Sequence, residues 1–142
     1  MAERVVVDTN VMTSALISPV GANRAVLRAC LSGKAQPLMG MALYLEFEDV
    51  LGREALMESS PLPPKERQEL LAAFLSICEW VRVYYLWRPN LPDEGDNHLL
   101  ELAMAGGAGS IITNNTRDLR AGELSFPQLR VESPTEYLTR TS

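Results

Sequence analysis

The residues Val5-Val6-Val7-Asp8 decide the expected fold, because a short β-branched run that ends in an acid indicates a buried strand with a carboxylate at the sheet edge. A second compact apolar run, Ser110-Ile111-Ile112-Thr113, has the same character. Helical patterns separate the two runs, and strands that alternate with helices predict a parallel sheet covered on both faces. We therefore expect a three-layer α/β/α sandwich with a mainly parallel central sheet.

The remaining elements are predicted from apolar spacing and from capping and stop signals. Asn23 is expected to cap a helix that runs to Leu31, and Ser133-Pro134-Thr135-Glu136 reads as a capping box that starts a short terminal helix. The other expectations are a strand over 37–41, helices over 42–56, after Pro64 and over 93–106, a strand over 81–85, and a polar loop over 114–118.

Length and charge limit the possible functions. The 142 residues fit one domain, 1–142, and the net charge of −5 would repel a polyanion unless a local feature overcomes it. Because no apolar run approaches the ~18 residues of a membrane helix, we expect a soluble cytoplasmic protein with no membrane partner. His98 is the only histidine, which argues against zinc sites and Ser-His catalysis, and we expect it to be exposed on its helix. Cys30 and Cys78 are expected to be buried free thiols.

Several acids fall where the chain would bring them to one edge of the sheet. Asp8 follows the first strand and Asp118 follows the strand over 110–113, and the carboxyl ends of parallel strands share an edge. Asp96 lies in the first turn of its helix, where the helix dipole favours an anion, and Asp93 could cap the same helix.

Helical geometry selects a fourth acid from the segment 42–56. At ~100° per residue, Glu46 borders the apolar face, whereas Glu48 and Asp49 point further into solvent. Taken singly, each acid has an ordinary structural explanation as a turn or cap residue. Together they predict a shared site. Oxygen ligands of this kind select Mg²⁺ or Mn²⁺, and the matching reaction is phosphodiester hydrolysis by a water that the metal activates.

The motifs around these acids resemble the PIN-domain nucleases. Val5-Val6-Val7-Asp8-Thr9-Asn10-Val11 looks like the opening motif of that family, and Asp96-Asn97-His98-Leu99-Leu100-Glu101-Leu102-Ala103 looks like its central acidic helix start. The stretches 45–51 and 110–119 are similar to its two other motifs. The four motifs occur in order over nearly the whole chain.

The resemblance implies an Mg²⁺- or Mn²⁺-dependent ribonuclease acting on RNA, often the toxin of a VapC-like toxin-antitoxin pair and often a homodimer. Carried over by position, the acidic metal-binding residues are Asp8, Glu46, Asp96 and Asp118. Asn10 and Thr113 fall on supporting polar positions, and Arg117 is a candidate phosphate contact. Many members carry an aspartate where this chain has Asn115, which would make Asn115 a neutral ligand or a substrate contact.

Other readings of the same residues stay open. Arg24 and Arg28, one helical turn apart, and Arg117 and Arg120 could line an RNA path or be surface charges. Tyr84, Tyr85 and Trp87 could stack bases or pack. An aspartyl phosphatase, a dehalogenase or a receiver domain is disfavoured, because Asn10 replaces the second aspartate and no lysine follows Lys65. The main rival is a PIN-like module that binds RNA or protein without cutting.

Overall fold

The computed structural model describes residues 2–53, 58, 60–83, 97–123 and 128–142. Its centre is a five-stranded sheet in the order β3-β2-β1-β4-β5, and every strand pairing is parallel. The elements, in chain order, are β1 (Glu3–Val7), α1 (Thr9–Ile17), α2 (Ala22–Leu31), β2 (Ala35–Met39), α3 (Met41–Leu51), α5 (Pro64–Ile77), β3 (Glu79–Trp80), α6 (Asn97–Gly106), β4 (Ser110–Ile112), α7 (Thr116–Glu123), β5 (Arg130–Glu132) and α8 (Pro134–Thr141).

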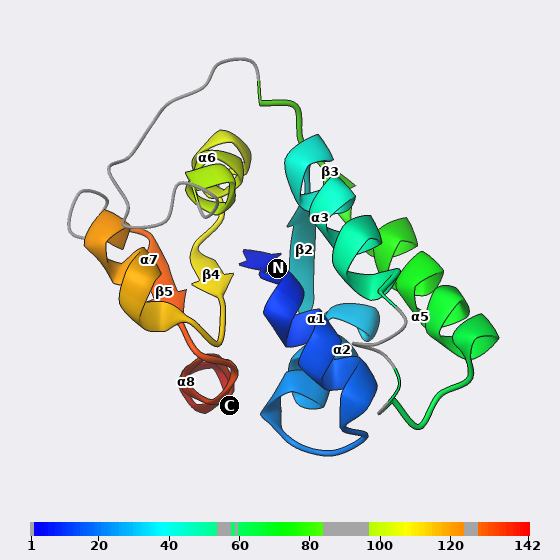
Figure 1. The fold of residues 1–142 in the computed structure, drawn as a ribbon. Coiled ribbons are helices and arrows are strands. Elements are labelled where there is room, and N and C mark those ends of the chain that lie inside the picture. The colour runs from blue at the N-terminus through cyan, green and yellow to red at the C-terminus, as the bar shows by residue number, and fades with distance from the viewer. Residues whose placement is uncertain (1, 54–57, 59, 84–96, 124–127) are drawn as a thin grey trace.

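Helices cover the sheet on both sides, as Figure 1 shows, so the expected three-layer α/β/α fold is confirmed. Helix α6 packs against β1, β2 and β4, whereas α2 and α5 pack against β2, and α8 packs against β5 and α2. The apolar residues of β1 and β4 are completely buried between these layers. No helix within the described residues is both long and apolar enough to cross a membrane.

Buried side chains of α3 and α5 meet in the core, where Phe47 and Phe74 lie with ring centroids 6.0 Å apart. Cys30 and Cys78 are buried free thiols, as predicted, and burial raises the pKa of each to about 12. The predicted capping box is also confirmed, because Ser133 and Glu136 exchange hydrogen bonds at the start of α8.

Three local predictions are wrong, and one strand was not predicted. The N-cap of α2 is Gly21, whose φ of 103° suits only glycine, so Asn23 lies inside the helix. The predicted strand over 81–85 is wrong at 81–83, which form no strand, and residues 84–85 lie outside the described residues; the edge strand is the two-residue β3, which pairs with β2 at Leu38 and Met39. Residues 116–118, expected in a loop, begin α7. The strand β5 carries too short an apolar pattern to be predicted.

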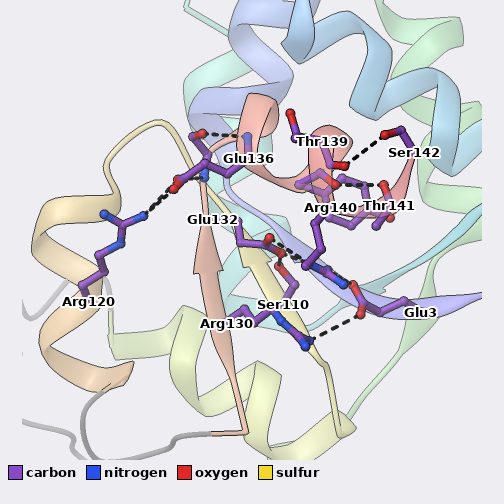
Figure 2. Close-up of polar contacts among 12 residues, drawn as sticks. Glu3, Ser110, Arg120, Arg130, Glu132, Glu136, Thr139, Arg140, Thr141 and Ser142 are labelled. Carbon is purple, nitrogen blue, oxygen red and sulfur yellow. Dashed lines mark hydrogen bonds and ion pairs between the residues drawn. The ribbon is translucent and has the colours of Figure 1, made fainter.

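The C-terminal helix is tied to the sheet by charged side chains (Figure 2). The Arg140 guanidinium donates to both carboxylate oxygens of Glu132, at 2.9 Å each, and to Glu3 at 2.6 Å. The Ser110 hydroxyl donates to Glu132 at 2.8 Å. These contacts join α8 to β1, β4 and β5. They hold α8 and the edge strand β5 against β1, the strand that leads to Asp8.

Candidate active site

The carboxylate of Asp8 lies at the carboxyl end of β1 and is buried. Its Oδ2 atom accepts a hydrogen bond of 2.7 Å from the Thr113 hydroxyl, and the Asn10 amide donates to the same oxygen at 3.3 Å. Burial raises the pKa of Asp8, the Thr113 hydrogen bond opposes that rise, and the nearby charge of Glu46 adds to it. The fold therefore holds a carboxylate at this edge at a cost in stability.

Glu46 reaches the same edge from α3. The Thr9 hydroxyl donates to its Oε1 at 2.7 Å, and Nε2 of His98 lies 2.9 Å from its Oε2. The hydrogen bond to His98 is the main cause that lowers the pKa of Glu46, against an opposing effect of burial. Glu46 is half-buried whereas Glu48 and Asp49 are exposed, as helical geometry predicts.

A chain of hydrogen bonds joins Asp8 to Asp118 in the first turn of α7. The Thr113 hydroxyl, which donates to Asp8, also accepts from the backbone N–H of Asn115 at 3.0 Å. The Asn115 side-chain amide in turn donates to Oδ2 of Asp118 at 3.0 Å. Asn115 thus holds Asp118 in place as a neutral hydrogen-bond donor. An aspartate at position 115 would instead repel the Asp118 carboxylate.

The loop after β4 is fixed to the first two helices through asparagines. The backbone N–H of Asn114 donates to Oδ1 of Asn10 at 3.1 Å, and the Asn114 side chain donates to Asn23 at 2.9 Å. Asn23, expected as a helix cap, therefore anchors the loop that carries Thr113 and Asn115. Nothing in the local sequence of α2 signals this contact, because it depends on the packing of α2 against α1.

The described residues supply part of the expected set of acids. Within them, no Lys or Arg side chain pairs with Asp8 or Asp118, and no three His, Cys, Asp or Glu side chains lie close enough to hold a metal. Asp96 and Asp93 lie outside the described residues, so the prediction for Asp96 stays a prediction. His98, the second residue of α6, contacts Glu46, so the first turn of α6 lies beside the Glu46 carboxylate.

Two contacts at Glu46 were missed by sequence reasoning. His98, expected to be exposed, is half-buried against Glu46, and Thr9 supplies the second hydrogen bond. The sequence could have indicated the role of Thr9, because Thr9 directly follows Asp8 and so lies at the same sheet edge. Nothing in the sequence indicated the contact of His98 with Glu46, because that contact requires α3 and α6 to pack together.

Most of the candidate arginines lie less favourably for contact with RNA phosphates than the sequence suggested. Nε of Arg24 donates at 2.7 Å to the carbonyl of Ala15, near the end of α1 that is remote from Asp8. Arg28 lines a groove with Ala2 and Glu3, at the opposite edge of the sheet from Asp8. Arg120 forms an ion pair with Glu136. Arg117 is exposed in the first turn of α7, beside Asp118. Tyr84, Tyr85 and Trp87 lie outside the described residues.

Fold and site together define a parallel α/β protein with two neighbouring carboxylates, Asp8 and Glu46, at the carboxyl ends of its central strands. A family model described as PIN domain matches residues 4–117, and the chain belongs to the PIN-domain family. No curated protein matches the chain. Among solved structures, it is similar to a chain in the crystal structure of VapBC2 from Rickettsia felis bound to a DNA fragment from their promoter. The TM-score is 0.59 and the identity 15%, over 92% of this chain and 98% of that one, a likeness that shows the fold alone.

Proposed function

We propose that this PIN domain is a metal-dependent endoribonuclease that hydrolyses phosphodiester bonds of RNA. The observation that carries the proposal is the Asp8 and Glu46 pair at the carboxyl edge of a parallel sheet, where burial and like charge raise the pKa of Asp8. Paired carboxylates without a cation cost stability, and proteins keep such an arrangement where it performs a function.

The residues that would hold the metal are Asp8, Glu46 and Asp118, together with Asp96. An all-oxygen set of this kind suits Mg²⁺ or Mn²⁺ and excludes metals that prefer sulfur or imidazole. When bound, such an ion supplies positive charge that offsets the carboxylates and stabilises the charge that develops on the phosphate. The same ion offsets part of the chain's net charge of −5, which otherwise repels RNA.

The surrounding side chains position the acids. Thr113 and Asn10 orient the Asp8 carboxylate, and Thr9 and His98 bind one oxygen each of Glu46. Carboxylates held by such outer hydrogen bonds bind a metal in one geometry, without an ordering cost at the moment of binding. Arg117, exposed next to Asp118, is available to contact a phosphate.

We also propose that the chain works as the toxin of a toxin-antitoxin pair and forms a homodimer. The support is family membership and the likeness to the structure of VapBC2, which is bound to a DNA fragment from their promoter. Co-purification of a small protein encoded beside this chain tests the antitoxin partner, and the molar mass in solution tests the dimer.

Single-stranded RNA incubated with the purified protein and Mn²⁺ is expected to be cut, and EDTA is expected to abolish cleavage. A thermal-shift titration should show that Mn²⁺ stabilises the fold, because the ion binds only the folded arrangement of carboxylates. Undiminished cleavage in EDTA would refute the metal site. Binding of Mn²⁺ without cleavage of any RNA would instead favour a PIN-like binding module.

Replacement of His98 tests the positioning of Glu46. The His98→Ala variant is expected to cleave RNA about 10–100-fold more slowly, the usual loss when an outer partner of a metal ligand is removed. His98→Gln should recover part of the loss, because its amide can still donate to Glu46. Met104→Ala, an exposed position on the same helix, is the control and should leave the rate unchanged. Equal rates for His98→Ala and wild type would show that Glu46 needs no such support.

A further inference from the structure

Two buried polar atoms on α6 have no hydrogen-bond partner among the residues that the structure describes. One is Nδ1 of His98, whose other ring nitrogen, Nε2, lies 2.9 Å from Oε2 of Glu46. The second is Oε1 of Glu101, a glutamate that is only 7% exposed. A buried donor or acceptor without a partner lowers stability, so two such atoms beside the candidate active site call for an explanation.

Helical geometry brings the two side chains to one side of α6. His98 and Glu101 are three residues apart, and residues at that separation are neighbours on one face of a helix. Helical side chains lean toward the N-terminus of their helix, which directs Glu101 back toward the turn that carries His98. Both residues line the same apolar groove of about 730 Å³, between α3, β3 and α6. Rotation of the Glu101 side chain can therefore bring its carboxyl group to the imidazole ring.

The other polar side chains of this groove match the Glu101 carboxylate less well. Trp80 and Arg82 also line the groove and carry N–H donors. Both residues are exposed, whereas Oε1 of Glu101 is sealed from solvent. Nδ1 of His98 is sealed in the same way and lies one helical turn away. A hydrogen bond between Nδ1 and Oε1 would satisfy both buried atoms at once.

We propose that Glu101 is a positioning residue, which fixes the His98 ring against Glu46 through a hydrogen bond between Oε1 and Nδ1. One proton lies between these two atoms, and a second proton lies between Nε2 and the Glu46 carboxylate. A ring that is held at both nitrogens cannot turn away from Glu46, so Glu46 keeps one orientation toward a metal. The inference rests on the proposed metal site and extends its support by one residue beyond His98.

NMR spectra of the metal-free full chain test the contact directly. His98 is the only histidine, so its two ring nitrogens can be assigned in ¹⁵N spectra without ambiguity. Glu101→Met keeps an unbranched side chain but cannot hydrogen-bond, and it is expected to shift the resonances of both ring nitrogens. Glu101→Gln should keep the Nε2 resonance near its wild-type position, because an amide can still bond to Nδ1. Arg82→Met, on the same groove, is the control and should leave both resonances in place.

Calorimetric titration with Mn²⁺ alone tests the consequence for Glu46. Glu101→Met is expected to weaken Mn²⁺ binding about three- to tenfold, less than the roughly 10–100-fold loss for a direct partner of a metal ligand. Glu101→Gln should bind Mn²⁺ nearly as well as the wild type. In the His98→Ala background, Glu101→Met should cause no further loss, because Glu101 acts only through His98.

Unchanged ring resonances in Glu101→Met, or an Mn²⁺ affinity that this variant leaves unchanged, would overturn the inference. Equal losses for Glu101→Gln and Glu101→Met would also overturn it, as would a loss that persists without His98 and so reports on packing. The nuclease proposal fails separately. If the wild type neither binds Mn²⁺ nor cuts RNA, the ring resonances still decide whether Glu101 holds His98, whereas Mn²⁺-dependent cleavage with unchanged resonances leaves only the nuclease standing.

Discussion

An Asp8→Asn variant is expected to unfold at a higher temperature than the wild-type protein. Its rate of RNA cleavage is expected to fall by about 10³-fold or more, which corresponds to several kcal/mol of metal-derived stabilisation of the transition state. Both effects have one origin. Asp8 is a buried carboxylate whose pKa is raised by desolvation and by the charge of Glu46. The amide of asparagine has nearly the same shape and carries no charge, so the folded chain no longer holds an unfavourable anion.

The gain in stability should depend on pH. Because the pKa of Asp8 is raised in the folded chain above its ordinary value of 3.8, the folded state holds the proton more tightly than the unfolded state. The wild-type protein therefore loses stability as pH rises from about the ordinary value through the raised folded value. The two proteins should be equally stable below pH 3.8, and the variant should be more stable at neutral pH, by about 0.5–2 kcal/mol, the usual scale of such gains.

Thermal unfolding at a series of pH values, with EDTA present, measures this difference. EDTA is needed because a bound ion would stabilise the wild-type protein and hide the cost of the carboxylate. Asp49→Asn is the matched control: Asp49 is exposed and pairs with Arg53 at the surface, so its replacement should change stability by less than about 0.5 kcal/mol. A neutral-pH stability of Asp8→Asn below that of the wild type would show that the Thr113 contact to the anion outweighs its burial.

The two strands that lead to the site could be predicted, because a buried strand leaves an apolar pattern in its own short stretch of sequence. Val5–Val7 and Ser110–Ile112 are β-branched or small apolar runs, and each is followed by a polar residue of the site, Asp8 and Thr113. Parallel pairing then places both residues at one edge without further information, and the register brings Val7 opposite Ile112. The helical position of Glu46 was predictable on the same local basis.

The contacts that organise the site were not predictable from the sequence, because they join elements distant along the chain. His98 and Glu46, for example, are 52 residues apart. Each such contact depends on the angle at which two elements pack and on a side-chain conformation, and neither leaves a periodic trace in the sequence. The same reasoning explains Asn23, which was expected to cap α2 but accepts a hydrogen bond from Asn114, 91 residues further along the chain.

Arg140→Met is expected to lower the free energy of unfolding by about 2–4 kcal/mol, the second large effect that the structure predicts. The substitution removes the ion pair that hydrogen-bonds both oxygens of the buried Glu132 carboxylate. Burial acts to raise the pKa of Glu132, but the hydrogen bonds from Arg140 and Ser110 prevail and lower it. Methionine keeps an apolar stem over the Tyr137 ring, where the guanidinium carbon lies 5.7 Å from the centroid. The loss therefore reports on the charge and its hydrogen bonds more than on packing.

Arg120→Met is the matched control for that measurement, because Arg120 also donates twice to one glutamate, Glu136, but in an exposed pair. Its replacement should cost less than about 1 kcal/mol in urea unfolding. Since the pKa of Glu132 is lowered in the folded chain, the contribution of the Arg140 contact is present above the ordinary glutamate value of 4.5 and is lost as pH falls through the folded pKa. The gap between the two variants should therefore narrow in acid. Equal losses at neutral pH would mean that Glu132 is hydrated in solution and that α8 is held to the sheet by its apolar contacts alone.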